Sequence, residues 1–266
     1  MPSNFKLDHF FKVNMSKGPG LYHDIGKKAR DVLYGDYAHQ PRTHFGFKNN
    51  IRWNFDLSCQ SPDILQGVSA YFRFLVPDSG RVELRYLNDY FGIAAGAGVR
   101  SYEDGVFRGE GYYPVVNVSG VAGSTFFSLG TDVTFNVAEG SFEEFRVGMS
   151  FNSPFIHSSV NLDDKLDAVK ASCYYSFNQL TRTAVAAELK HNFSTSGKTT
   201  LTFGAQHSMF PYTLMKARMN TDFKMSALFR LDLWNKLLLA FTGEMNMMAS
   251  DSDKISKVGV SMAFNL

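Results

Sequence analysis

The chain has 266 residues, and its 27 lysine and arginine residues nearly balance its 25 aspartate and glutamate residues. This balance excludes a strong electrostatic case for nucleic acid as the main partner. No run of 18 or more apolar residues occurs, which excludes a membrane-spanning helix, and two cysteines are too few for a disulfide framework or a four-thiolate metal site. Aromatic residues make up 15% of the chain, and 22 glycines accompany only 8 prolines, a mixture that favours strands joined by tight turns.

The first predicted element is a short amphipathic helix within residues 18–37, GPGLYHDIGKKARDVLYGDY. Apolar residues recur at helical spacing from Leu21 to Leu33, and charged residues cover the rest of the surface. Pro19 suits a first helical turn, and Gly35 is the predicted C-terminal stop. The pattern predicts one helix near the start of the chain.

After this helix the hydrophobic period changes to two and stays there. In residues 51–58, IRWNFDLS, every second side chain is apolar and the alternate ones are polar, as in a strand with one apolar and one polar face. Sixteen such segments follow one another, with short turns such as AEGS from residue 138, which is the spacing of a meander. The predicted strands are 43–48, 51–58, 68–76, 81–90, 91–99, 113–122, 126–136, 142–152, 155–162, 168–178, 183–193, 199–208, 213–220, 224–233, 236–248 and 256–265.

The apolar face continues across many strands. Strand 126–136, for example, places Phe127 and Leu129 on one face and Ser128 on the other. In a soluble two-sheet sandwich these apolar faces would pack against each other, whereas in a membrane barrel they would face lipid around a wet lumen. Periodicity leaves both architectures open. The number of strands and their length of roughly ten residues, which matches a tilted membrane crossing, favour the membrane barrel.

Five separate blocks of the sequence carry a resemblance to a known family, in that family's order. They are MSKGPGLYHDIGKKARDVLYGDY (15–37), VPDSGRVELRYLNDYFGI (76–93), VVNVSGVAGSTFFSLGTDVTF (115–135), KASCYYSFNQLTRTAVAAELKHNFST (170–195) and LTFGAQHSMFPYTLMKARMN (201–220). Together they resemble plant mitochondrial outer-membrane porins, the voltage-dependent anion channel family, and the resemblance covers most of residues 15–266. It implies an all-β fold, a transmembrane antiparallel β-barrel that has nineteen strands in the family, with the segment 15–37 as an amphipathic helix in the lumen. It also implies a mitochondrial outer-membrane location and the passive passage of small anions and nucleotide metabolites, without enzyme chemistry or a cofactor.

The chain departs from the family pattern in its first third. Residues 1–14, MPSNFKLDHFFKVN, form an atypical extension before the family's usual start; it is either functional or a product of counting from Met1 where translation begins at Met15. The stretch before residues 68–74 is about thirty residues shorter than in the family, roughly three strands, so we expect early strands and the fifth to be missing.

A barrel of about sixteen strands is therefore expected over residues 43–266. An even count lets the first and last strands pair antiparallel, and the barrel would be roughly a sixth narrower than one of nineteen. The alternative is that the shortened sheet does not close. Residues 102–112, YEDGVFRGEGY, are expected to be an inserted loop.

Several positions differ from the family where basic residues are expected. Gly35 stands where the family has lysine, and residues 67–69 read Gly-Val-Ser in place of Gly-Leu-Lys. Two basic groups that the resemblance ties to metabolite binding are thus absent. Phe210 replaces an aspartate of the family's late signature, while Lys216 and Arg218 are kept.

If the apolar faces look outward, the polar faces line the channel and carry an excess of positive charge. This predicts a weak anion preference, because fixed positive charge raises the local anion concentration and is screened only over about 8–10 Å. Alternatively, individual charges merely solvate a surface, and Lys27 and Arg30 dock the helix on acidic residues of the wall. The predicted basic residues are Lys27, Lys28, Arg30, Arg52, Arg73, Arg81, Arg85, Arg146, Lys170, Lys190, Lys216, Arg218 and Arg230, and the acidic ones are Asp24, Asp31, Asp56, Glu83, Asp132, Glu144, Glu188, Asp232 and Glu244.

The last predicted strand contains KVGVSMAF at residues 257–264. Lys257, Gly259, Met262 and Phe264 resemble the sorting signal of mitochondrial barrels, which implies the barrel-assembly machinery as a partner. The alternative is that any final amphipathic strand would match so short a pattern.

Membrane lipid is the expected surrounding partner of the barrel. Three functions stay open: a conducting channel, a protein-import pore of the same barrel class, and a non-conducting variant that acts as a scaffold. GLYHDIGKKARD argues against the import pore, and the missing strands suggest the scaffold. Homo- or hetero-oligomers are compatible with each of them. No enzyme is predicted, because His157, His191 and His207 are scattered and the glycine-rich residues 96–100 lack the following helix that a phosphate loop needs.

Overall fold

The computed structural model describes most of the predicted strands and the helix. The extension 1–14, Met15 and residues 102–110 of the predicted loop lie outside the described residues. Within the described part of the chain, no helix is both long and apolar enough to span a bilayer. The described residues are 18–35, 44–46, 52–53, 55–61, 66–76, 79–101, 111–178, 180–194, 197–209, 212–233, 237–247 and 257–264.

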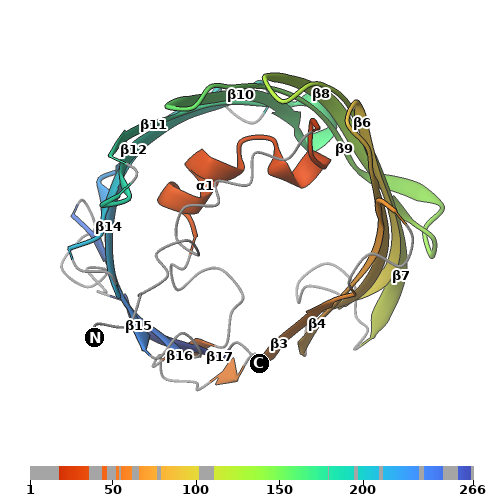
Figure 1. Ribbon diagram of the computed structural model, residues 1–266. Coiled ribbons are helices and arrows are strands. Elements are labelled where there is room, and N and C mark those ends of the chain that lie inside the picture. The colour runs from red at the N-terminus through yellow and green to blue at the C-terminus, as the bar shows by residue number, and fades with distance from the viewer. Residues whose placement is uncertain are drawn as a thin grey trace, which may run out of the picture.

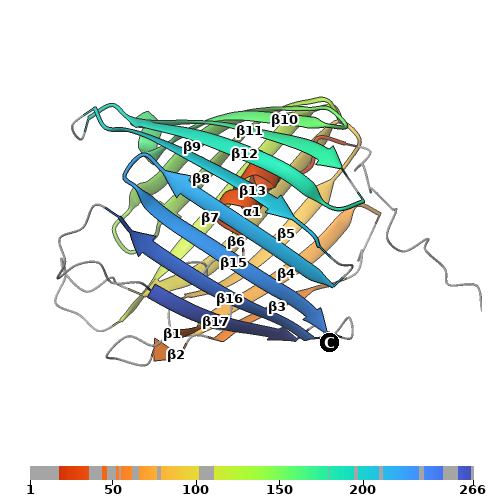
Figure 2. The same ribbon diagram turned by 90° about the vertical axis from the view of Figure 1, so that its left-hand side faces the viewer.

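The strands form one sheet that curves into a ring (Figure 1), and they cross its wall obliquely (Figure 2). Four of them, β4, β11, β14 and β15, have the predicted bounds, and the others differ by a few residues at their ends. The strands are β1 (His44–Gly46), β2 (Arg52–Trp53), β3 (Phe55–Gln60), β4 (Val68–Val76), β5 (Ser79–Leu87), β6 (Phe91–Ser101), β7 (Tyr112–Gly123), β8 (Phe127–Asn136), β9 (Ser141–Asn152), β10 (Ile156–Asp163), β11 (Ala168–Asn178), β12 (Thr183–Asn192), β13 (Thr199–His207), β14 (Thr213–Asn220), β15 (Lys224–Leu233), β16 (Leu237–Asn246) and β17 (Lys257–Phe264).

Every pairing between described strands is antiparallel, and from β3 to β17 each strand pairs with the next one in the chain. β1 closes the ring, because it pairs with β17 through Phe45 opposite Val260 and with β2 through Phe45 opposite Trp53. Closure gives hydrogen-bond partners to the backbone N–H and C=O groups at the strand edges, which lipid cannot provide.

The described sheet has seventeen strands, where the sequence predicted sixteen. β2 and β3 are separated only by residue 54 and together occupy the predicted strand 51–58, so the described strands correspond to the sixteen predicted ones. The first and last strands pair antiparallel. The predicted antiparallel β-barrel is therefore confirmed.

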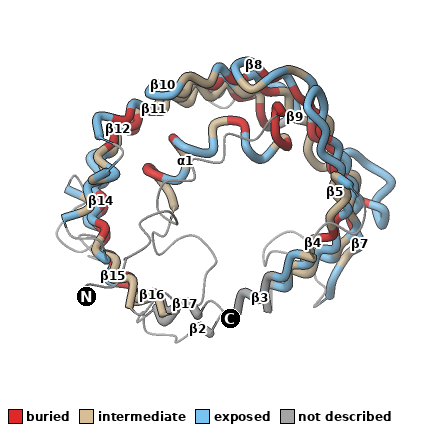
Figure 3. The backbone as a smooth tube through the Cα atoms, viewed as in Figure 1, coloured by how far each residue is buried: buried red, intermediate tan, exposed pale blue. Residues whose placement is uncertain are grey.

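The apolar face of the sheet points outward. In β8, Phe127 and Leu129 are each 49% exposed while Ser128 between them is fully buried, and in β16 Phe241 is 44% exposed while Thr242 is 7% exposed. Exposed and buried residues alternate in this way around the wall (Figure 3). A soluble sandwich, in which these aromatic side chains would be packed together, is thereby excluded, and the outer surface suits lipid.

The predicted single helix is present but shorter and divided. A 3-10 turn, η2 (Tyr22–Asp24), precedes the α-helix α1 (Lys27–Leu33), and Gly26 between them has a φ of 69°. A residue in this left-handed conformation cannot continue an α-helix, so the segment within 18–37 is divided where one helix was predicted. The α-helix ends at Leu33 with Tyr34 as its C-cap, so the predicted stop, Gly35, is the first residue beyond the cap.

Candidate functional site: the polar lumen

Helix α1 lies inside the ring, packed on β11 to β14 (Figure 1). Its apolar residues are almost fully buried, with Ala29 at 2%, Val32 at 1% and Leu33 at 0% exposure. The wall makes room with small residues: a side chain on Gly204 would begin 2.7 Å from Leu33 Cδ2, and Ala186 packs in the same cluster. Among the described residues, this cluster of buried apolar side chains therefore docks the helix on the wall and does not form a central core.

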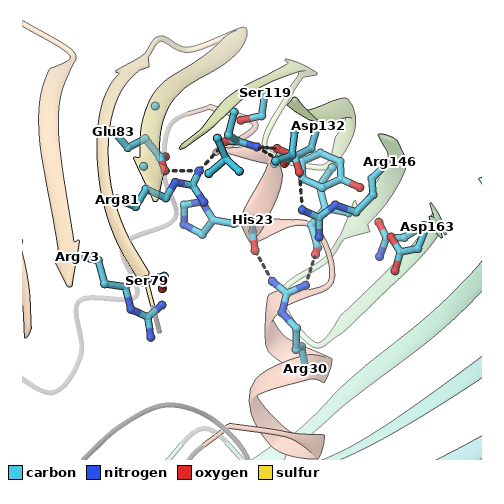
Figure 4. Close-up of a pocket in the computed structure, with 18 of the residues that line it drawn as sticks. His23, Arg30, Arg73, Ser79, Arg81, Glu83, Ser119, Asp132, Arg146 and Asp163 are labelled. Carbon is cyan, nitrogen blue, oxygen red and sulfur yellow. Dashed lines mark hydrogen bonds and ion pairs between the residues drawn. The ribbon is translucent and has the colours of Figure 1, made fainter. Parts of the chain in front are cut away.

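The rest of the described lumen contains an open cavity of about 1040 Å³ between the η2–α1 segment and strands β4 to β12. Figure 4 shows Arg30 of the helix on one side of this space and Arg73, Arg81 and Arg146 of the wall around it. Eight basic and four acidic side chains line it. The basic ones are Arg30, Arg73, Arg81, Arg85, Arg100, Arg146, Lys170 and Lys190, and the acidic ones are Glu83, Asp132, Asp163 and Glu188.

Two arginines of β5 flank one carboxylate, and a third arginine lies on the neighbouring strand β4. Arg81 Nη2 lies 2.5 Å from Glu83 Oε2, and Arg85 Nε lies 2.9 Å from Glu83 Oε1. Arg73 is directly opposite Arg81 in the register of the two strands. Arg85 also stacks on Tyr71, with its guanidinium 4.0 Å from the ring centroid. This part of the wall carries more positive than negative charge, which favours anions nearby.

The next basic residues around the wall are more fully compensated. Arg146 Nη2 lies 2.7 Å from Asp132 Oδ2 and 2.6 Å from Glu144 Oε2. Lys170 Nζ lies 2.5 Å from Asp163 Oδ2. Further round, Arg230 pairs with Asp232 of its own strand at 3.1 Å. Pairs of this kind weaken the field that each cation projects into the lumen.

Sequence reasoning missed Arg100 and Glu143. The predicted strand 91–99 stopped one residue short of Arg100, although the inward alternation of Gly96 and Gly98 would have reached it. Glu143 is the extra residue of a β-bulge, since Phe135 pairs with Phe142 and Thr134 with Glu144. Two consecutive glutamates thereby reach Arg100, at 2.8 Å from Glu143 and 3.3 Å from Glu144, and period-two reasoning cannot foresee such a bulge.

The basic residues of the helix contact both the helix and the wall. Lys27 pairs with Asp24 at 3.1 Å, and Lys28 Nζ lies 2.6 Å from His157 Nε2 of β10. Arg30 donates to the carbonyl of Ile25 at 3.3 Å and to that of His23. Lys27 therefore pairs within its own segment and not with an acid of the wall.

Burial on the lumen side also changes the ionisation of this segment. It lowers the pKa of Lys28 and raises that of Tyr22 to about 12, with the nearby Asp163 carboxylate acting in the same direction. For Asp24 burial acts to raise the pKa, but His23, the backbone N–H of Leu21 and Lys27 outweigh it and lower the pKa. At neutral pH Asp24 is therefore ionised and Tyr22 keeps its proton.

Lys216 and Arg218 of β14 hold the end of the helix. Lys216 Nζ donates to the carbonyls of Asp31 at 2.7 Å and Gly35 at 3.1 Å, and Arg218 Nη1 donates to that of Leu33 at 3.0 Å. Neither residue is among those that line the described cavity.

The remaining predicted residues are placed by their backbone. Arg52 lies in β2, with its side chain outside the described part. Lys257, Gly259, Met262 and Phe264 lie in β17, where Lys257 is opposite Glu244 and Gly259 is opposite both Thr242 and Gly46. Among the described residues no group of three or more His, Cys, Asp or Glu side chains could hold a metal ion.

Comparison with known proteins gives a consistent picture. Residues 46–259 match the model of the family described as eukaryotic porin. The chain is 38% identical to the mitochondrial outer membrane protein porin of 36 kDa from Solanum tuberosum and 34% identical to mitochondrial outer membrane protein porin 1 from Arabidopsis thaliana, with 94% of this chain and 99% of each relative covered. Each alignment spans 287 positions, more than the 266 residues of the chain, so the relatives contain segments that this chain lacks.

Solved structures share the fold at low sequence identity. A variant of the Rh. blastica porin superposes with a TM-score of 0.57 at 8% identity, covering 84% of this chain and 97% of that one. A second variant gives the same TM-score and coverage at 10% identity. At this identity the likeness concerns the fold alone.

Proposed function

Because the chain belongs to the eukaryotic porin family, we propose that it is a voltage-gated, weakly anion-selective diffusion channel for small anions and metabolites. The protein is a porin of the mitochondrial outer membrane, in contact with lipid and with metabolites in transit. Anion preference, voltage gating and nucleotide passage are the specific properties that we propose for this channel.

The observation that carries the channel function is the orientation of the two faces of the sheet. Large apolar side chains such as Phe127 and Phe241 are exposed on the outside, while the inside is polar and holds an open cavity of about 1040 Å³. An outward apolar band is stable only in lipid, and a polar interior of this size is filled with water. A closed, wet barrel in a membrane conducts small solutes.

The charge of the lumen supports a weak preference for anions. The eight basic side chains around the cavity outnumber the four acidic ones, and Arg81 and Arg85 share a single carboxylate, Glu83. The preference is weak because Arg146 and Lys170 are paired with acids and because salt screens charges over about 8 Å. Such a lumen attracts anionic metabolites, including nucleotides, without rejecting cations.

The N-terminal segment supports voltage gating, because it places charged groups inside the pore. Lys28 and Arg30 belong to a helix whose contacts with the wall are few compared with those of a strand in the sheet. A charge that moves through the membrane field gains or loses about 2.3 kcal/mol per 100 mV. Displacement of this segment would thus respond to voltage.

The scaffold alternative rested on the missing strands, and the described pairing argues against it. β1 joins β17 and β2 through antiparallel pairs, so the described strands form a closed ring. We further propose that Lys257, Gly259, Met262 and Phe264 in the last strand are read by the barrel-assembly machinery, because they lie together in β17 at the closing seam.

Planar-bilayer recording of the refolded protein tests the channel function. We expect stepwise conductance that falls at high voltage of either sign, and a reversal potential in a KCl gradient on the anion-selective side of zero. Insertion into the bilayer without conductance would contradict the channel and favour the scaffold. A reversal potential on the cation-selective side would contradict the proposed selectivity alone.

A further inference from the structure

Two cations of one strand converge on the C-terminal end of helix α1. Lys216 Nζ donates to the carbonyls of Asp31 and Gly35, at 2.7 and 3.1 Å, and Arg218 Nη1 donates to the carbonyl of Leu33 at 3.0 Å. The last carbonyls of a helix have no partner within the helix, and positive charge there is favourable. The wall therefore supplies what the end of this short helix lacks.

A second attachment lies directly beside the first. Tyr34, the residue after the helix, donates its hydroxyl hydrogen to Glu188 Oε1 of β12 at 2.6 Å. The guanidinium of Arg218 lies 5.2 Å from the centre of the Tyr34 ring, and it is itself held by Ser226 Oγ at 3.2 Å. Side chains of β12 and of β14 thus both hydrogen-bond to the end of the helix.

The burial of these cations sets them apart from the arginines of the cavity. The Arg218 side chain is 14% exposed and the Lys216 residue 6%, whereas the Arg81 side chain is 44% exposed. A cation buried against carbonyl oxygens and away from the open space contributes little to the field that a passing anion meets. Its hydrogen bonds to the helix, in contrast, are the strong kind made by a charged donor.

We infer that Lys216 and Arg218 are positioning residues that clamp the C-terminal end of α1 to the wall, and that their main effect on the channel is through the helix. The inference deepens the proposed function, since it assigns the residues that hold the charged segment inside the pore. The clamp fixes the depth of Leu33 against Gly204 and Ala186 and hence where the helix charges stand in the lumen.

Thiol protection measures whether the helix is docked, without any conduction. Val32, which is 1% exposed, is replaced in a Val32→Cys variant that also carries Cys59→Ser and Cys173→Ser, because both native thiols are exposed. The refolded protein is labelled with a water-soluble maleimide. We expect slow labelling, and an increase of about tenfold or more in rate when Lys216→Gln and Arg218→Gln are added, since the docked state then loses hydrogen bonds from charged donors.

The matched control is Arg230→Gln, which removes one lumenal positive charge on the adjacent strand, from a residue paired with Asp232 of its own strand. It should leave labelling slow, and Arg218→Lys should keep most of the protection. If the wall variants fail to fold, Tyr34→Ala removes the ring beside Arg218 as well as the hydrogen bond to Glu188 without altering the wall, and it should raise the labelling rate.

Two readouts separate this inference from the proposed function. Equal labelling rates in the Lys216→Gln/Arg218→Gln and Arg230→Gln variants would overturn the clamp even if the channel conducts. So would equal shifts of the reversal potential in Arg218→Gln and Arg230→Gln together with slow labelling in both, because Arg218 would then act as a simple lumenal charge. A silent channel with the expected labelling pattern would overturn the proposed function and leave the clamp standing.

Discussion

Arg81, Glu83 and Arg85 share the lumenal face of β5, and Glu83 is 4% exposed between the two arginines. We expect Arg81→Gln to move the reversal potential in a KCl gradient towards zero and Glu83→Gln to move it further to the anion-selective side. Loss of the ion pair with the half-exposed Arg81 should cost less than about 1 kcal/mol of unfolding free energy. Shifts of the same sign in both variants would show that altered packing, and not charge, sets the selectivity.

Gly26 combines a left-handed backbone with a close approach to the wall. Its φ is 69°, and a Cβ there would lie 2.5 Å from Ser159 Oγ. We expect Gly26→Ala to raise the labelling rate of Val32→Cys, because backbone strain of roughly 1–2 kcal/mol adds to the clash. Gly140, with a φ of 65° and open space around it, is the control. Gly140→Ala introduces the same backbone strain but no clash with a neighbouring side chain. Faster labelling of Val32→Cys in that variant as well would point to a general loss of stability.

At the scale of single residues the sequence predicted which side chains are polar and inward, but not what they touch. Arg81, Arg85, Arg146 and Lys170 do line the cavity, because alternation along a regular strand determines the face. Lys216 also faces inward, yet it contacts a helix that is 181 to 185 residues away in the chain. Pairings over such a distance depend on the closed three-dimensional shape and leave no trace in local periodicity.

At the scale of the element, β7 places neighbouring residues on opposite sides of the wall. Val118 is 50% exposed on the outside, whereas Ser119 is 7% exposed, lines the cavity and lies opposite Asp132. A lysine on the lipid face near the midplane of a barrel costs about 2–4 kcal/mol. We therefore expect Val118→Lys to lower the unfolding free energy in lipid vesicles by roughly this amount, measured by urea titration.

The same lysine one residue further along should be tolerated. In Ser119→Lys the ammonium group enters the wet lumen beside the Asp132 carboxylate, so we expect only a small change in unfolding free energy. Equal destabilisation by the two substitutions would contradict the assignment of the faces. The reverse order would mean that the lumen of β7 is dry and its outer side wet.

Strands were predicted more accurately than the helix for a physical reason. A strand in this barrel separates lipid from water along its whole length, so its period-two pattern starts and stops where the strand does. β4 and β11 accordingly have the predicted bounds. The helix faces a wall of small residues on one side only, and its break depends on the φ of Gly26, which composition does not reveal.

At the scale of the whole molecule, periodicity alone could not tell a sandwich from an inverted barrel, because both need the same alternation. The resemblance and the strand count favoured the barrel, and the outward exposure of Phe127, Leu129 and Phe241 now supports it directly. Closure was the open question, since a sheet that lacks strands must still join its ends in lipid. β1 makes that join through three residues opposite Gly259, Val260 and Ser261.

A disulfide across the seam tests this closure. Phe45 and Val260 are direct partners in the antiparallel register of β1 and β17, and the Cα atoms of such partners are about 4.5–5.5 Å apart, within the range that a disulfide spans. In a background with Cys59→Ser and Cys173→Ser, we expect Phe45→Cys with Val260→Cys to form an intramolecular disulfide on mild oxidation in membranes. A gel-mobility shift reversed by reductant reports it.

The register supplies the control for this seam. Phe45→Cys with Val258→Cys displaces one thiol by two residues along β17, on the same face of the strand, and should cross-link far less because the two Cα atoms are then out of register. Efficient cross-linking in both pairs would mean that the strands slide past each other. If neither pair formed a disulfide while the protein was folded and inserted, the ring would be open at β1, and a backbone edge would have to be satisfied by another chain.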